Sequence, residues 1–296
     1  MIPLPIAEVQ AAVAETRRRL DRHASAAADS ASTDAARFAR LLARLEGRIT
    51  APPRVVLLGE FNSGKSTLAN ALIGADALPT SIHANTRVPL HARYASQPAF
   101  ILELLDGSRV PLDEQTVVHL QAGSVRVLHV GMPVPRLATF ELIDTPGLAQ
   151  GTDRPDRLVM EACRRAHIAV WCTAATQAWK ATEAAVWNAL PLRLRSRSML
   201  VATLADALNS DRDRTRLEMR LRAEAGDRFA DVVMVSAAEV EALRTAPRTP
   251  DHAERWLASG GAALDSALER LIDAEWETRP ASLERVLARF TARLER

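Results

Sequence analysis

The residues best suited to chemistry lie together at positions 59–67, which read GEFNSGKST. This stretch fits the phosphate-binding loop pattern G-x-x-x-x-G-K-[ST] at every fixed position. In such a loop, successive backbone N–H groups turn toward an anion, and the positive end of the following helix faces the same anion. Lys65 would reach the terminal phosphates, and the Ser66 hydroxyl would hold Mg²⁺. The predicted phosphate-binding residues are Gly59, Glu60, Phe61, Asn62, Ser63, Gly64, Lys65, Ser66 and Thr67.

The segments on either side of the loop support this interpretation. Residues 55–58 are an apolar run typical of a buried strand, and residues 68–73 have helical periodicity. Strand, glycine loop and helix is the context that the motif requires. Lys65 and Lys180 are the only lysines among 38 lysine and arginine residues. A lysine is slimmer than the planar guanidinium of arginine, so its presence at position 65 favours a working loop.

A second motif, Asp144-Thr145-Pro146-Gly147, follows a predicted strand at 137–143. A carboxylate there can bind Mg²⁺ through water, and the Gly147 N–H can contact a γ-phosphate. The same tetrapeptide is also good turn chemistry and could form a simple helix-capping turn. Its position after a phosphate-binding loop favours the first interpretation. Thr80 and Thr86 are candidates for a further magnesium ligand, and Thr86 lies closer to the next predicted strand.

Two further strand ends carry polar residues that could meet a nucleotide base. The segment from Thr203 to Asp206 ends a strand that begins at Met199, and the Asp206 carboxylate could accept hydrogen bonds from N1 and N2 of guanine. Ser236 and Ala237 follow the strand at 232–235 and could approach the same base. Each also has an ordinary alternative, because an aspartate or a serine at a strand end often caps the next helix.

Strands alternate with helices through the middle of the chain, which predicts an α/β fold with a doubly wound, mainly parallel sheet. In such sheets, ligands bind at the carboxyl ends of the strands. The predicted strands are 55–58, 89–95, 100–105, 124–130, 137–143, 168–172, 199–204 and 232–235. The predicted helices between them begin with the one after the phosphate-binding loop, closed by Gly74, and continue at 113–120, 155–166, 180–190 and 212–225.

Helical sequence flanks this middle part on both sides. Residues 5–50 have helical spacing of apolar residues up to Pro52-Pro53, and residues 246–252 form a proline-bearing linker. Helices are expected at 253–275 and 280–295, with a break at Arg279-Pro280. The expected domains are therefore N-terminal helices at 1–50, a nucleotide domain at 51–246 and C-terminal helices at 247–296. The two helical parts could pack together as a small bundle.

Composition limits the kinds of partner. A net charge of +2 gives no long-range attraction to nucleic acid or to an anionic membrane, so no nucleic-acid partner is expected. Cys163 and Cys172 match no metal-binding spacing and are expected to be reduced, buried residues in a cytoplasmic protein. No signal peptide and no membrane-spanning run is recognisable, so any membrane contact would be peripheral.

With these segments identified, the chain resembles the dynamin family of GTPases, in its bacterial dynamin-like branch. The resemblance covers about residues 52–240. It implies that Lys65 contacts the β- and γ-phosphates, that Asp144 holds the magnesium-bound water, and that Asp206 selects guanine. It also implies Ser66 and Thr86 as magnesium ligands. The segments that carry it are GEFNSGKST (59–67), LPTSIHANTRVPL (78–90), DTPGL (144–148), TLAD (203–206) and VSA (235–237).

The resemblance further implies GTP or GDP with Mg²⁺ as ligands, and hydrolysis that is faster when two GTPase domains dimerise across the nucleotide. The partner would be a second copy or another dynamin-like protein. Many members of the family remodel membranes. Lys65, Thr86 and Asn62 are the expected catalytic residues.

Three features depart from the family pattern. Leu204 replaces the lysine that packs on the base, and Leu148 follows the glycine of the second motif where a glutamine could orient water. Phe61 and Asn62 replace a catalytic glutamine and serine found in some dynamins. They leave open a nucleotide-dependent switch or scaffold with negligible hydrolysis, and the loss of the lysine leaves open an ATPase of the same fold.

Overall fold

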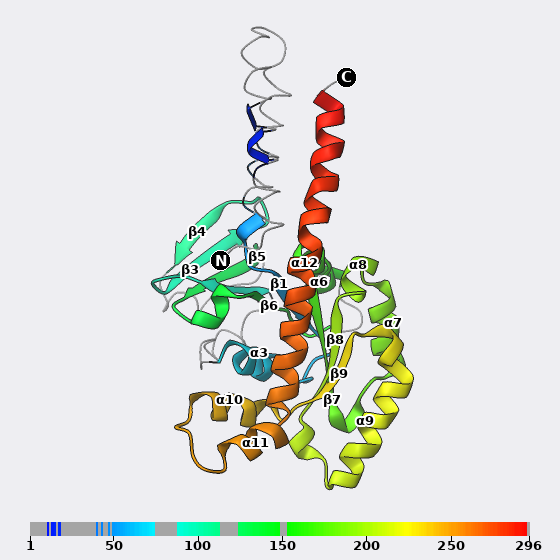
Figure 1. The fold of residues 1–296 in the computed structure, drawn as a ribbon. Coiled ribbons are helices and arrows are strands. Elements are labelled where there is room, and N and C mark those ends of the chain that lie inside the picture. Colours follow the sequence, from blue (N-terminus) through cyan, green and yellow to red (C-terminus); the bar gives the residue numbers. More distant parts are fainter. Residues whose placement is uncertain are drawn as a thin grey trace. The chain divides into compact units, whose positions relative to one another are not determined.

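The computed structural model of the chain (Figure 1) divides into two compact units, residues 53–272 and residues 1–52 with 273–296. The larger unit contains the predicted nucleotide domain, and each unit is considered by itself. The residues that the structure describes are 11, 13–15, 17, 18, 40, 43, 47, 49–74, 88–112, 124–148 and 153–294.

The larger unit is built on a nine-stranded sheet with the strand order β4-β3-β5-β2-β6-β1-β7-β8-β9. Five of its eight strand pairings are parallel, which confirms the mainly parallel α/β fold. The strands are β1 (Arg54–Leu58), β2 (Leu90–Tyr94), β3 (Ala99–Leu104), β4 (Arg109–Leu112), β5 (Val125–Met132), β6 (Glu141–Asp144), β7 (Ile168–Ala174), β8 (Ser198–Thr203) and β9 (Asp231–Met234).

Strands β6, β1, β7, β8 and β9 are neighbours and all run in the same direction. Their register aligns the ends of the strands, with Leu57 opposite Asp144 and Ala174 opposite Thr203. The predicted motifs follow β1, β6, β8 and β9. They therefore meet at one edge of the sheet, which we call the carboxyl edge.

Helices cover both faces of the sheet because residues along each strand alternate between the faces. On β1, Val55 and Leu57 belong to one hydrophobic cluster, whereas Val56 and Leu58 belong to the other. The first face packs against α3 (Lys65–Ile73), α10 (Ala237–Thr245) and the start of α12 (Gly261–Leu294). The second face packs mainly against α6 (Asp153–Arg165), α7 (Ala181–Ala189), α8 (Leu192–Arg195) and α9 (Asp211–Ala225) (Figure 1).

The fold differs from the sequence prediction at several elements. Strand β4 was not among the predicted strands. It contains Pro111, which is tolerated because β4 lies at the edge of the sheet. Helix α10 was also missed. The predicted strand at 137–143 is shorter, since residues 135–138 form a 3₁₀ turn before β6. The predicted helix at 113–120 lies outside the described residues.

The boundary of the nucleotide domain falls later than the sequence predicted. Helix α11 (His252–Ala258) and the first part of α12 belong to the larger unit, because Leu264, Leu268 and Leu271 are buried in the first hydrophobic cluster. The larger unit thus extends to residue 272, whereas the sequence analysis placed the end of the nucleotide domain at residue 246.

In the smaller unit, the described positions between residues 11 and 50 are helical, and residues 273–294 continue α12. The predicted helix break at Pro280 is wrong, since α12 continues through it. Contacts around the preceding residue offset the lost backbone hydrogen bond. Arg279 donates to the Ala51 carbonyl, pairs with Glu275 and lies 4.0 Å from the centre of the Trp276 ring. No helix in the described part of the chain is long and apolar enough to cross a membrane.

Candidate nucleotide site at the carboxyl edge

The predicted phosphate-binding loop turns sharply between β1 and α3. Gly59 has φ 149° and Gly64 has φ 72°, both in the region that favours glycine. A Cβ atom on Gly59 would lie 2.2 Å from the carbonyl oxygen of Cys172 in β7. The loop therefore needs glycine here to pass the neighbouring strand. Gly64 is the N-cap of α3, which places the positive end of that helix at the loop.

Lys65 reaches back over the loop. Its Nζ lies 3.1 Å from the Gly59 carbonyl oxygen, 2.7 Å from the Glu60 carbonyl oxygen and 3.3 Å from Ser63 Oγ. The residue is only 7% exposed, and this burial lowers the pKa of its ammonium group from 10.5. A cation held by three oxygens at the mouth of the loop is suited to neutralise an entering phosphate.

The two predicted magnesium ligands that the structure describes are adjacent. Ser66 Oγ donates to Asp144 Oδ2 at 3.3 Å, although the two residues are 78 positions apart in sequence. A hydroxyl and a carboxylate are the hard oxygen donors that Mg²⁺ prefers, so this pair fits the ion. Thr86 and its alternative Thr80 lie outside the described residues, and their roles stay predictions.

The Asp144–Gly147 segment packs directly on the phosphate-binding loop. The Leu148 N–H donates to the Gly59 carbonyl oxygen at 3.0 Å. A Cβ atom on Gly147 would lie 2.7 Å from Phe61 Cα, so only glycine allows this approach. Thr145 attaches the segment to β1, because its hydroxyl donates to the Leu57 carbonyl oxygen at 2.6 Å.

The loop also exposes two residues at its tip. Phe61 is 76% exposed, and Asn62 is exposed with a left-handed backbone at φ 61°. Asn62 is among the residue types that tolerate this conformation well. Asn62 is exposed at the loop, so its side chain is accessible to a ligand. Its catalytic role stays a prediction.

The residues predicted to contact a base have different environments. Asp206 is exposed, in a 3₁₀ turn directly after β8. Thr203 is fully buried and donates its hydroxyl to the Ser63 carbonyl oxygen at 2.6 Å. Its hydroxyl therefore supports the phosphate-binding loop, and the contact of Thr203 with a nucleotide stays a prediction. Ser236 and Ala237 are each 4% exposed.

Leu204 lies between Thr203 and Asp206 in the left-handed region, with φ 55° and 39% exposure. A left-handed conformation is unfavourable for leucine, by about 1 kcal/mol. The turn therefore holds an apolar side chain toward solvent at the carboxyl edge, where it could lie against a flat base.

The sequence analysis did not predict the contacts that connect the phosphate-binding loop to the start of α7. Glu60 accepts hydrogen bonds from Lys180 Nζ at 2.9 Å and from the Thr182 hydroxyl at 2.7 Å. The Lys180 hydrogen bond is the main reason that the pKa of Glu60 lies below its usual value. The start of α7 is fixed in turn by Glu183, a buried carboxylate that accepts from Trp171 Nε1, Thr173 Oγ1 and the Lys180 N–H. Lys180 is one of only two lysines in the chain, and this was the only feature of the sequence that pointed to a special role for it.

Comparison with known proteins gives a consistent result. A model of the dynamin family matches residues 55–109, which include the phosphate-binding loop. Dynamin-like protein 2 of Campylobacter jejuni is 28% identical over 162 residues, covering 53% of this chain and 26% of that protein. Isoniazid-induced protein IniC of Mycobacterium tuberculosis is 30% identical over 132 residues, covering 41% of this chain and 27% of that protein. The chain thus spans about a quarter of the length of these relatives.

Among solved structures, one is described as an oligomerised bacterial dynamin pair that provides a mechanism for the long-range sensing and tethering of membranes. It matches with a TM-score of 0.62 and 16% identity, over 98% of this chain and 55% of that chain. At this identity the likeness concerns the fold.

Proposed function

We propose that this chain is a dynamin-like GTPase that binds GTP with Mg²⁺ and hydrolyses it, in keeping with its similarity to the dynamin family. The observation that carries the proposal is the meeting of Lys65, Ser66 and Asp144 at the carboxyl edge, within a loop whose glycines allow close approach of a phosphate.

Each residue has a role that its position supports. Lys65 would neutralise the β- and γ-phosphates, and the N–H groups at the start of α3 would bind their oxygens. Ser66 and Asp144 would hold Mg²⁺, which supplies positive charge to the phosphate oxygens when bound. The Gly147 N–H would face the terminal phosphate, and its packing on Phe61 would couple that segment to the loop.

We assign guanine selection to Asp206, which is exposed beside Leu204. In calorimetric titrations with GTP, GDP and ATP in Mg²⁺, guanine nucleotides are expected to bind more tightly. Asp206→Asn is expected to weaken GTP binding by at least about tenfold, or 1.4 kcal/mol, because an amide places a donor where the base also donates.

Asp227→Asn makes the same change at an exposed position in the turn after α9 and is the matched control. It should bind GTP as the unchanged chain does. ATP binding as tight as GTP binding, or no effect of Asp206→Asn, would contradict guanine selection and favour the ATPase alternative.

We further propose that two GTPase domains associate through the carboxyl edge, as a homodimer or with another dynamin-like protein. Phe61 and Leu204 are exposed apolar side chains at this edge, 76% and 39% exposed. Large apolar groups in such positions often mark a contact surface. A partner across this edge would shield the nucleotide from water and could supply the group that orients the attacking water.

Hydrolysis should therefore depend on protein concentration. We expect GTP turnover per molecule to rise by at least about tenfold from dilute to concentrated protein. Phe61→Ser should remove this rise while GTP binding persists. Leu192→Ser is the control, because Leu192 is 74% exposed on α8, which precedes the amino end of β8.

Turnover that is negligible at every concentration would favour the alternative, a nucleotide-dependent switch or scaffold. Leu148, Leu204 and Phe61 are the residues that favour this alternative. Constant, substantial turnover per molecule would retain the GTPase and contradict association. For location, we propose the cytoplasm, with any membrane contact peripheral; the buried free thiols of Cys163 and Cys172 suit a reducing compartment.

A further inference from the structure

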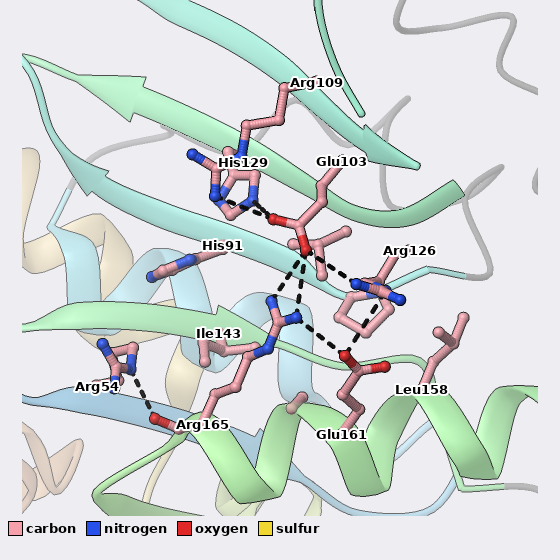
Figure 2. A pocket seen from close by; sticks show the side chains of 13 residues that line it. Arg54, His91, Glu103, Arg109, Arg126, His129, Ile143, Leu158, Glu161 and Arg165 are labelled. Carbon is pink, nitrogen blue, oxygen red and sulfur yellow. Dashed lines mark hydrogen bonds and ion pairs between the residues drawn. The ribbon is translucent and has the colours of Figure 1, made fainter. Parts of the chain in front are cut away.

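A second site of concentrated charge lies away from the carboxyl edge. A cavity of about 310 Å³ opens between the β2–β6 part of the sheet and α6 (Figure 2). Arg54, at the start of β1, and Arg165, at the end of α6, both line it. The phosphate-binding loop follows the other end of β1, and a strand of five residues is about 15 Å long. We call this cavity the arginine pocket.

Glu103 of β3 is at the centre of the arginine pocket, and side chains from three other elements converge on it (Figure 2). Its carboxylate lies 3.1 Å from His129 Nε2, 3.2 Å from an Arg109 nitrogen and 3.2 Å from two Arg165 nitrogens. Arg126 approaches at 3.6 Å. Burial alone would raise the pKa of Glu103, but the hydrogen bond from His129 and the arginine charges lower it to about 2. Glu103 is thus an ionised internal counter-ion.

The acids that line the arginine pocket do not balance its bases. Among the described residues, four arginines line it, whereas Glu103 and Glu161 are the only carboxylates that do so. The lining arginines therefore exceed the lining carboxylates by two. The carboxylate of Glu141 lies just outside this lining, 3.0 Å from His91 Nε2, and Arg93, also outside the lining, is close enough to act on its charge.

The hydrogen-bond donors are also in excess. Each guanidinium has five N–H donors, whereas the two carboxylates offer about eight acceptor positions. In addition, the Arg165 carbonyl oxygen accepts from Arg54 and the Leu105 carbonyl oxygen accepts from Arg126. One donor is left without an acceptor as a result. The Nε of Arg126 is buried, makes no hydrogen bond and lies 3.6 Å from a Glu161 oxygen. A buried donor left in this way costs about 1–3 kcal/mol. An anion that supplies further acceptors would remove that cost.

The arginine pocket can be reached from solvent. The side chains of Arg109, Arg165 and Arg126 are 63%, 39% and 26% exposed, whereas that of Glu103 is 7% exposed. The arginines therefore form the rim and Glu103 forms part of the floor. Apolar side chains such as Leu158 and Ile143 complete the wall. A small ligand entering here meets guanidinium groups first.

We propose that the arginine pocket binds a small phosphate-bearing dianion, with Arg126 and Arg165 as the principal donors and Glu103 as an internal competitor for them. The excess of two charges matches a dianion. The planar forks of guanidinium groups match pairs of phosphate oxygens, which compact ammonium groups do not. The volume is at the small end of ligand cavities, which suits a phosphate monoester and not a nucleotide triphosphate. Nothing in this assignment depends on the proposed GTPase activity.

The test is calorimetric titration with inorganic phosphate at constant ionic strength, with chloride as the reference salt. The chain of residues 1–296 carrying Lys65→Ala is used throughout, so that phosphate binding at the nucleotide loop is suppressed. Arg165→Gln should weaken phosphate binding by at least about tenfold through loss of a bidentate donor. Glu103→Gln should tighten it by at least about fivefold, because the competing charge is removed while the side-chain shape is kept.

Arg216→Gln, at an exposed position on α9, is the control for charge alone and should change phosphate binding less than about twofold. Thermal denaturation checks that each variant is folded. Should Arg165→Gln not fold, Arg109→Gln at the exposed rim provides the same test. The gain expected for Glu103→Gln separates a binding site from a purely structural ion cluster, since a structural cluster would show no gain.

The source of the phosphate is tested in two further arms. Glycerol 3-phosphate represents a soluble monoester, and vesicles containing phosphatidic acid represent a lipid headgroup, with phosphatidylcholine vesicles as reference. Binding in either arm that responds to Arg165→Gln supports the proposal and identifies the source. No phosphate binding above the chloride reference, binding indifferent to Arg165→Gln and Glu103→Gln, or tighter binding of succinate would each overturn it.

Discussion

Replacing Lys65 by alanine is expected to weaken GTP and GDP binding by at least about 100-fold, or 2.7 kcal/mol, in calorimetric titration. The ammonium group is buried against the loop and would be the nearest full positive charge to the β- and γ-phosphates. Its loss would leave two phosphate groups to be bound by backbone N–H groups and a helix end, which carry only partial charge.

The two lysines of the chain allow a sharper comparison. Lys65→Arg should weaken GTP binding nearly as much as Lys65→Ala does. Three oxygens lie within 3.3 Å of the ammonium group and Lys65 is only 7% exposed, so the wider guanidinium would not fit. Lys180→Arg makes the same change where the side chain is 42% exposed, and the ion pair with Glu60 should persist. We expect its GTP affinity to change by less than about threefold.

Circular dichroism melting should show that all three lysine variants are folded. Tight GTP binding by Lys65→Ala would place the nucleotide elsewhere on the chain. Tight binding by Lys65→Arg would show instead that the loop opens more widely than the structure indicates, and the steric argument for lysine would fail.

The parts of the site that the sequence predicted are those encoded by contiguous residues. Gly59 to Thr67 determines both a chemistry and a backbone path, since the glycines are needed for the turn that the lysine completes. The Asp144–Gly147 motif is similarly local, and the parallel order of strands brings it to the same edge. The pairing of Ser66 with Asp144 therefore follows from two local motifs and a parallel sheet.

The remaining features depend on contacts between distant residues. The Glu60–Lys180 ion pair joins positions 120 apart in sequence, and neither residue belongs to a motif that names the other. Thr203 has the residue type of a ligand contact, yet burial turns its hydroxyl to the Ser63 carbonyl oxygen. The arginine pocket is built from separate strands and one helix, so no window of sequence contains it.

Two errors in the predicted secondary structure, the missed strand β4 and the break at Pro280, both involve a proline. Both Pro111 and Pro280 oppose regular structure locally. The sequence predicted a break at Arg279-Pro280, and it predicted no strand at 109–112. Tertiary contacts decide otherwise at both positions. Pro111 lies in an edge strand, and the residue before Pro280 is tied to Glu275, Trp276 and the Ala51 carbonyl.

Gly59→Ala should lower the free energy of unfolding by about 3 kcal/mol and abolish detectable GTP binding. The added Cβ would lie 2.2 Å from the Cys172 carbonyl oxygen and 2.7 Å from Ser63 Oγ, at a φ of 149° that alanine rarely adopts. The loop would have to move away from β7. This movement would displace the Gly59 carbonyl oxygen, which both Lys65 and the Leu148 N–H contact.

Gly226→Ala is the matched control, because Gly226 has a helical backbone and no atom within 4 Å of an added Cβ. It should leave binding unchanged and raise stability by about 0.5 kcal/mol, as alanine restricts the unfolded chain. Urea unfolding followed by tryptophan fluorescence reports on the larger unit, since Trp171, Trp179 and Trp187 are buried in its second hydrophobic cluster. Equal stability and equal GTP binding in the two variants would mean that the close passage of the loop past β7 is not required. Loss of stability with GTP binding intact would separate the packing role of Gly59 from phosphate binding, and the geometric basis of the proposed site would have to be revised.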